Sequence, residues 1–476
     1  MDDFWKSFWS LKTLNLGVLV LLTVQCALYF WQLAVAWVEL RRQRHRAPRT
    51  DPWWVLTSDI TLPISLLVPA YNEENTIVEN VRSMLSLHYP DFEIIVVNDG
   101  STDRTLQRII EALELEPVQR VYQLAVPHKQ VRGLYGNPRH PRLLVVDKEN
   151  GGKSDALNAG INLSRFPLFC AVDADSLLDH DSLLAVVRPF IEEPEEMIAV
   201  GGRVQIVNGC VVRSGQVVET GLPHQMLPLL QTVEYIRSFL ISRLAWSRLN
   251  AMLIISGAFG VFKRAAAIKV GGYSHNTVGE DMEIVVKLHR HFRENGIRYQ
   301  MRYVPDSICW TEAPQTFKLL RLQRTRWQRG MVQTLVKHRK MIFNAAYGPA
   351  GTVGMGYFFL FDLIGPLVEL FGYFLIPISY FQHVVPWDFF LAYLMLTFTY
   401  GVFISVGSLL IEMTVTRNAR VRDLGLLTLA AIAENFGYRQ VNNLWRLEGI
   451  WQFLRGKKGW GDMTRSGFLQ IPDRKE

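Results

Sequence analysis

The sequence predicts an α/β domain of the Rossmann-like type, attached to α-helical transmembrane and interfacial segments. Between residues 64 and 176, a buried-strand pattern, a polar loop and a helical pattern recur, which is typical of a parallel sheet covered by helices. The 476 residues are 49% hydrophobic, more than a soluble enzyme of this size needs. Membrane segments are therefore expected beside the α/β domain.

Four strands are expected from apolar runs that end at polar loops: Ile64–Ala70, Phe92–Val97, Leu143–Val146 and Leu168–Val172. Because parallel sheets bind ligands at the carboxyl ends of their strands, the four loops are expected to line one crevice. Turn or helix-cap chemistry is the commoner explanation for each loop alone, whereas their convergence favours a binding site. The side chains concerned are Glu73, Asp99, Lys153, Asp173 and Asp175.

Two carboxylates, Asp173 and Asp175, follow the fourth strand directly. Residues two apart in an extended chain point the same way, so both are expected to face one pocket. Hard oxygen ligands suit Mg²⁺ or Mn²⁺, and Mg²⁺ prefers one or two carboxylates together with phosphate oxygens and water. A D-x-D tripeptide by itself is more often a polar turn, so the metal hypothesis depends on the neighbouring loops.

An apolar segment, Leu14–Val38, is long enough to cross a bilayer, and no small-residue cleavage site follows it. It is therefore predicted to be an anchor. The arginine cluster at 41–46 predicts that the next domain lies on the cytoplasmic side of a bacterial-type inner membrane. A nucleic-acid partner is not expected from the net charge of +7, because the basic residues lie beside apolar segments.

Two further spans are expected at Val353–Phe381 and Trp387–Met413, which makes the protein multi-pass. Residues 424–454 begin apolar and then carry charged and amide side chains, so they either line a sugar conduit or form an interfacial helix. Three regions result: an anchor at 1–47, a cytoplasmic domain with interfacial helices at 48–340, and a transmembrane and interfacial region at 341–476.

Two other helical segments carry polar residues of interest. Glu280 and Asp281 begin one helix, where acidic side chains favour the helix dipole, and that alone accounts for them. A strongly basic helix at 317–340 contains Gln323-Arg324-Thr325-Arg326-Trp327. On composition alone it is a cationic helix that faces the membrane.

Taken in order, these motifs resemble those of the inverting glycosyltransferase family that contains cellulose, chitin, hyaluronan and poly-N-acetylglucosamine synthases. The resemblance covers roughly residues 64–330 and implies a GT-A nucleotide-sugar-binding fold. The matching segments are Val68–Glu74, Asn98–Ser101, Lys153–Asn158, Asp173–Asp175, Gly279–Asp281 and Gln323–Trp327.

Seven residues are implied to bind the donor and its metal ion. A nucleoside diphosphate needs an aromatic wall, an acceptor for the uracil imide N–H and a cation beside the phosphates, and the residue types agree. The implied set is Pro69, Tyr71, Glu73 and Asp99 at the uridine, Lys153 at the nucleotide or its phosphates, Asp173 at the nucleotide-sugar and Asp175 at Mg²⁺ or Mn²⁺.

The acceptor side needs a different set, since inverting transfer uses one base opposite the leaving group. The resemblance implies that Asp281, in the acidic triplet with Glu280, is this base. Trp327 would stack under the acceptor sugar, as a flat indole suits a sugar face. Gln323, Arg324 and Arg326 would help to hold the diphosphate or the terminal saccharide.

The predicted function is therefore that of a metal-dependent, inverting UDP-sugar glycosyltransferase that builds a β-linked polysaccharide and exports it across the bilayer. The preferred donor is UDP-N-acetylglucosamine, the acceptor is the growing polysaccharide, and a small accessory membrane subunit is a further candidate partner. Two alternatives stay open. The enzyme adds one sugar to a lipid acceptor, or the chain is an inactive membrane scaffold for a partner synthase.

Overall fold

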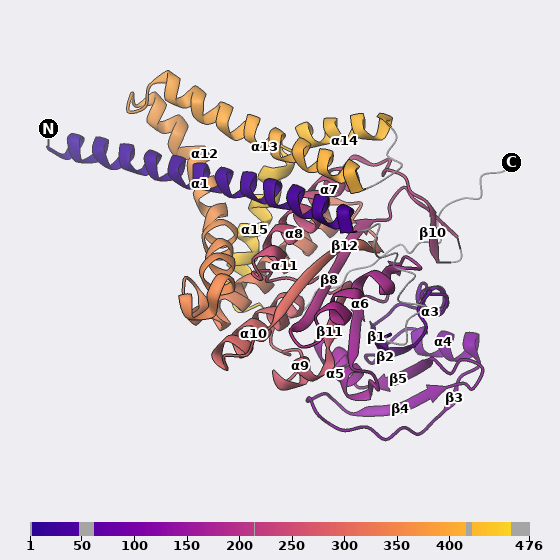
Figure 1. Ribbon diagram of the computed structural model, residues 1–476. Helices are drawn as coiled ribbons and strands as arrows, with labels where there is room; N and C mark the ends of the chain where they lie inside the picture. Colours follow the sequence, from indigo (N-terminus) through magenta and orange to yellow (C-terminus); the bar gives the residue numbers. More distant parts are fainter. Residues whose placement is uncertain (1, 47–60, 214, 416–420, 458–476) are drawn as a thin grey trace.

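The computed structural model describes residues 2–46, 61–213, 215–415 and 421–457 (Figure 1). The predicted boundary between anchor and cytoplasmic domain, at residues 47 and 48, lies outside these ranges. An α/β domain occupies one side of the molecule (Figure 1). The long helices α1 (Asp2–Arg46), α12 (Gly365–Phe381) and α13 (Trp387–Val415) lie together on the other. The predicted fold class is confirmed.

The four predicted strands form a parallel core in the order β5-β2-β1-β6. Strand order in the whole ten-stranded sheet is β3-β4-β5-β2-β1-β6-β11-β8-β12-β7. The strands are β1 (Ile64–Ala70), β2 (Phe92–Asn98), β3 (Glu116–Pro117), β4 (Val131–Gly136), β5 (Leu143–Lys148), β6 (Leu168–Val172), β7 (Leu177–Leu178), β8 (Met197–Ile206), β11 (Phe259–Lys263) and β12 (Gln300–Thr311); β9 (Val211–Arg213) and β10 (Gln216–Glu219) form a separate hairpin.

Both faces of the parallel core are covered, which explains the uninterrupted apolar runs in its sequence. Leu67 and Ile95 belong to one apolar cluster, and their neighbours Leu66 and Ile94 belong to the cluster on the other face. The helices of the α/β domain are α3 (Ile77–Leu85), α4 (Thr105–Leu113), α5 (Lys153–Leu163), α6 (Ser182–Glu192), α9 (Arg264–Lys269) and α10 (Glu280–Glu294).

Within the described residues, two helical stretches are long and apolar enough to cross a bilayer, Leu11–Arg42 and Ala350–Phe381. The first belongs to α1 (Asp2–Arg46), and the second joins the π-helices η5 (Ala350–Met355) and η6 (Phe358–Ile364) to α12 (Gly365–Phe381). They contain the first two predicted spans. The third predicted span falls within α13 (Trp387–Val415), whose apolar stretch Gly401–Met413 is shorter, so multi-pass topology stays a prediction.

The segment 424–454 is not one helix. It forms α14 (Val421–Ala433) and α15 (Tyr438–Leu454), and the chain turns between them at Gly437, which has φ 95°. Helix α15 lies along α11 (Phe317–Lys337). The remaining helical segments are α7 (Met226–Tyr235), η2 (Ile236–Ser242), α8 (Arg243–Arg248), η3 (Arg339–Met341) and η4 (Ala345–Tyr347).

The loop before α10 touches α11 backbone to backbone. A Cβ atom added to Gly330 would lie 2.7 Å from the Cα of Gly279, so neither glycine has room for a side chain. Gln333 of α11 strengthens this contact, since its Oε1 accepts a hydrogen bond from the Val278 N–H at 3.0 Å. The start of α10 is therefore held in a fixed position relative to α11.

Gly330→Ala is expected to destabilise the fold by about 1–3 kcal/mol, because the added methyl group meets backbone atoms that cannot turn away. Thermal unfolding of the full chain in detergent measures the loss. Gly425→Ala is the matched control, since a Cβ atom there meets nothing within 4 Å. Equal melting temperatures for the two variants would contradict the close contact.

Candidate active site

One cavity of about 510 Å³ lies between the α/β domain and the long apolar helices. It brings together eight residues that were proposed from the sequence: Lys153, Asp173, Glu280, Asp281, Gln323, Arg324, Arg326 and Trp327. Five others, Pro69, Tyr71, Glu73, Asp99 and Asp175, are not among the residues that line it. The cavity thus joins both acidic motifs to the basic helix α11.

Lys153 lies at the first turn of α5 and contacts two acids of the cavity. Its Nζ forms an ion pair with Asp173, and Glu280 Oε1 is 3.5 Å away. Gly257 leaves the space for this arrangement, because a Cβ atom there would be 2.9 Å from Lys153 Nζ and 3.6 Å from the Cβ of Asp281. Lys153 and Asp281 therefore lie on the same small patch of cavity wall.

Asp99 is buried next to the loop that leads into Lys153. Its Oδ1 accepts hydrogen bonds from Lys148 Nζ at 2.6 Å and from the Gly151 N–H at 3.0 Å, and its Oδ2 accepts one from the Gly152 N–H at 2.7 Å. Lys148 is fully buried and also pairs with Asp155. A buried lysine between two aspartates holds the loop after β5 against the loop after β2.

The sequence interpretation missed Lys148 and Asp155. The available signal was a lysine at the end of an otherwise apolar run, which needs a buried acid as its partner. Asp155 lies within the motif Lys153–Asn158, for which only Lys153 has a predicted role.

The ends of β1 and β2 are joined directly, since the Asp99 N–H donates to the Ala70 carbonyl at 2.9 Å. Pro69 pairs in register with Val97 in these strands. Tyr71 is 48% exposed at the same end, so its ring is open to a ligand. Glu73 accepts a hydrogen bond from Thr76 Oγ1 at 2.9 Å, which keeps this carboxylate at the start of α3.

The expectation that Asp173 and Asp175 face one pocket is wrong. Residues 173–176 are not extended but form a turn, closed by a hydrogen bond from the Ser176 N–H to the Asp173 carbonyl at 3.0 Å. Asp173 lines the cavity, whereas Asp175 is 4% exposed and does not. Among the described residues, no group of three or more His, Cys, Asp or Glu side chains is placed to hold a metal ion.

The carboxylates of this turn nevertheless suit a metal ion whose remaining ligands are diphosphate oxygens and water. Mg²⁺ in nucleotide sites takes one or two carboxylates and completes its shell with phosphate oxygens and water. Asp173 supplies one such carboxylate on the cavity wall, and Asp175 follows it, buried, in the same turn. The assignment of Asp175 to the metal stays a prediction.

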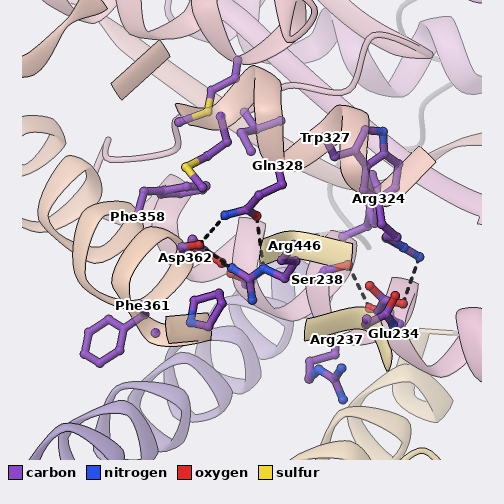
Figure 2. Close-up of a pocket in the computed structure, with 18 of the residues that line it drawn as sticks. Glu234, Arg237, Ser238, Arg324, Trp327, Gln328, Phe358, Phe361, Asp362 and Arg446 are labelled. Carbon is purple, nitrogen blue, oxygen red and sulfur yellow. Dashed lines mark hydrogen bonds and ion pairs between the residues drawn. The ribbon is translucent and has the colours of Figure 1, made fainter. Parts of the chain in front are cut away.

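On the acceptor side, Trp327 projects from α11 and is 39% exposed. The guanidinium carbon of Arg324 lies 4.4 Å from the centre of its ring, and Arg324 Nη2 donates to Glu234 Oε2 at 2.9 Å. Figure 2 shows these three side chains along one side of the cavity. Glu234 was not proposed from the sequence.

The cavity continues between α1, α12 and α15. Arg446 of α15 donates to Asp362 Oδ1 at 2.7 Å and to Gln328 Oε1 at 3.1 Å (Figure 2). All three side chains line the cavity. Asn442 and Asn443 of α15 also line it. Polar side chains of α15 therefore line the cavity, while the choice between a sugar conduit and an interfacial helix stays a prediction.

Glu280 has an unusual pKa at the centre of the site. Burial raises the pKa most, nearby Lys153 lowers it and nearby Asp281 raises it, and the net result is a pKa of about 7. Near neutral pH a substantial fraction of Glu280 therefore carries a proton, unlike an ordinary glutamate.

The sheet, its polar loops and the attached helices define a GT-A type transferase domain joined to apolar helices. Residues 62–330 match the family described as "Glycosyltransferase like family 2", and the chain belongs to this family.

Relatives are found among bacterial polysaccharide synthases. The poly-beta-1,6-N-acetyl-D-glucosamine synthase of Staphylococcus epidermidis is 30% identical over 274 residues, which are 58% of this chain and 56% of that protein. The enzyme of the same name from Staphylococcus aureus strain MSSA476 is 28% identical over 274 residues. The matched region spans about 56% of the length of these relatives.

Among solved structures, the mannosyltransferase PcManGT of Pyrobaculum calidifontis, in complex with GDP-Man and Mn²⁺, aligns with 94% of this chain and 100% of its own. The TM-score is 0.51 and the sequence identity 17%. This likeness supports the fold.

Glu280→Gln is expected to change how stability depends on pH. Between pH 4.5 and about 7 the unfolded chain has lost the Glu280 proton while the folded chain retains it, so stability falls as pH rises through this range. The effect amounts to about 3 kcal/mol at most, and the glutamine variant lacks it. Melting temperatures at pH 5 and pH 8 test this: the wild type should lose more than the variant, and equal losses would contradict the raised pKa.

Lys148→Met is expected to cost about 3–5 kcal/mol of stability, since Asp99 and Asp155 would keep their charges without the buried cation. Lys269→Met is the control, because this lysine is exposed in the last turn of α9 and the change should stay within about 0.5 kcal/mol. Denaturant unfolding measures both variants. A loss no larger than that of the control would show that the buried pairs do not stabilise this edge.

Proposed function

We propose that this chain is a UDP-sugar-dependent, inverting glycosyltransferase that extends a β-linked polysaccharide, with UDP-N-acetylglucosamine as its donor. One observation carries the proposal: a single cavity joins Lys153, Asp173 and Asp281 to Trp327 and then continues between the apolar helices. The names of the relatives support the choice of sugar and product.

For the donor, the proposal assigns the uridine to the edge where β1 and β2 end. The exposed ring of Tyr71 offers a stacking surface, and Pro69, Glu73 and Asp99 are assigned to the uridine at the same edge. Asp99 keeps the loop of Gly151 and Gly152 in place through the hydrogen bonds that its oxygens accept. Lys153 gives a fixed positive charge next to the departing diphosphate. Asp173, on the cavity wall, is assigned to the nucleotide-sugar, and Asp175 is the residue that would hold Mg²⁺ or Mn²⁺, an ion that would offset the charge of that diphosphate.

For the transfer, the proposal assigns Asp281 as the base. It takes the proton of the acceptor hydroxyl while the hydroxyl oxygen attacks the anomeric carbon and UDP leaves from the opposite face. Trp327 stacks on the acceptor sugar and so fixes the attacking hydroxyl. Gln323 and Arg326 line the cavity beside the ring and are assigned to the diphosphate or the terminal saccharide, and protonated Glu280 adds no second negative charge beside Asp281.

For export, the proposal assigns the far part of the cavity to the product. Asn442, Asn443 and Arg446 offer hydrogen-bonding groups to a saccharide between α1 and α12. The chain would then act at the inner membrane, with the anchor at 1–47, the catalytic domain at 48–340 on the cytoplasmic side and the export region at 341–476. A small accessory subunit remains a proposed partner.

A second candidate is transfer of a single sugar to a lipid acceptor. The apolar side chains of Val18, Leu21 and Leu22 on α1 line the same cavity and suit a lipid chain. The two candidates differ in product length.

Turnover of the purified full chain in lipid nanodiscs, with a panel of UDP-sugars and Mg²⁺ or Mn²⁺, tests the proposal. We expect a polymer ladder from UDP-N-acetylglucosamine, which linkage-specific glycosidases then identify. A single glycolipid would support the lipid acceptor instead. No turnover with any donor would favour an inactive scaffold.

Asp281→Asn is expected to lower kcat by about 10²–10⁴-fold, because the amide cannot accept the acceptor proton. The melting temperature should stay near that of the wild type, since the side chain keeps its shape. Radiolabelled sugar incorporation at saturating donor measures the effect. A loss within tenfold of the wild type would remove Asp281 from the role of base.

A further inference from the structure

One carboxylate of the cavity lies outside all the sequence motifs. Glu234 is near the end of α7, and its Oε2 accepts a hydrogen bond from Arg324 Nη2 at 2.9 Å and another from the Tyr438 hydroxyl at 2.8 Å. The three side chains come from α7, α11 and α15, and up to 204 residues separate them in the sequence. One carboxylate oxygen therefore ties three helices together.

Arg324 connects this carboxylate to the ring of Trp327. The two residues are three positions apart on α11 and share one face of that helix. The guanidinium carbon is 4.4 Å from the ring centre, a distance at which a cation is attracted to the face of an indole. The guanidinium group thus lies between Glu234 and Trp327 (Figure 2).

Arg324 needs Glu234 in order to stay where it is. Its side chain is only 7% exposed, and a buried cation is costly unless a carboxylate compensates it. Burial lowers the pKa of Arg324, and Glu234, together with Tyr438 and Tyr235, raises it above its usual value. Without Glu234 the guanidinium group would be drawn toward solvent, and the stacking on Trp327 would be lost.

We propose that Glu234 is a positioning residue for the acceptor: through Arg324 it holds the Trp327 ring in the orientation that stacks on a saccharide, and Tyr438 holds Glu234 in turn. This inference rests on the proposed function, in which Trp327 meets the acceptor sugar. Glu234 touches no reacting atom. Arg324, held between Glu234 and the Trp327 ring, is assigned to the saccharide and not to the diphosphate. Removal of Glu234 should therefore weaken acceptor binding and leave donor binding unchanged.

The test uses the full chain in nanodiscs with an N-acetylglucosamine oligosaccharide as acceptor and saturating UDP-N-acetylglucosamine. Glu234→Ala should raise the acceptor KM by about five- to thirtyfold. This is the change in affinity that corresponds to the free energy of one lost cation–π contact. The donor KM and kcat should stay within about twofold of the wild type. A general structural defect would instead lower kcat or shift both KM values.

A double-mutant cycle asks whether Glu234 acts through the ring. Trp327→Ala and the double variant Glu234→Ala with Trp327→Ala should have the same acceptor KM within about twofold, because the ring that Glu234 orients is then absent. Effects that simply multiply would overturn the inference. Tyr438→Phe should raise the acceptor KM by a smaller factor with an unchanged melting temperature, so it replaces Glu234→Ala if that variant does not fold.

Glu448→Gln is the matched control. It breaks the ion pair between Arg321 and Glu448, at 2.7 Å, which joins the same helices α11 and α15 outside the cavity lining. This variant should leave the acceptor KM unchanged. The inference fails if the control raises the acceptor KM as much as Glu234→Ala does, or if Glu234→Ala has no effect in an active enzyme. An inactive wild type would instead refute the proposed function.

Discussion

Two glycines, Gly279 and Gly330, touch through their backbones, and the geometry of the cavity depends on this contact. Asp281 lies two residues after the first glycine, and Trp327 lies three residues before the second. The distance between the acidic motif and the indole is therefore set by main-chain packing and not by flexible side chains. In a transferase, this contact keeps the proposed base Asp281 at a constant distance from Trp327, the proposed stacking residue for the acceptor sugar.

Buried charges in the site occur as pairs drawn from different elements. Lys148 compensates Asp99, Lys153 compensates Asp173, and Glu234 compensates Arg324. Because an unpaired buried charge is costly, each pair orients its side chains before any ligand arrives.

The wall of the cavity is shared between the α/β domain and the apolar helices. The π-helix η6 contributes the Asp362 carbonyl, which accepts hydrogen bonds from Gln328 and Arg446. π-Helical turns leave main-chain groups without their usual partners, so side chains from α11 and α15 can bind there. The proposed transfer site and the proposed product path therefore share the helices α11 and α15.

The sequence by itself determined the parallel core and the loops that carry the motifs, because apolar runs ending in polar loops are local signals. It also determined which helix bears Trp327 and which begins with Asp281. Only the tertiary structure decided that Asp173 lines the cavity and Asp175 does not, since that depends on a turn hydrogen bond and not on strand alternation. The partners Lys148, Glu234 and Tyr438 likewise followed from folding, because pairing of buried charges depends on which distant segments meet in space.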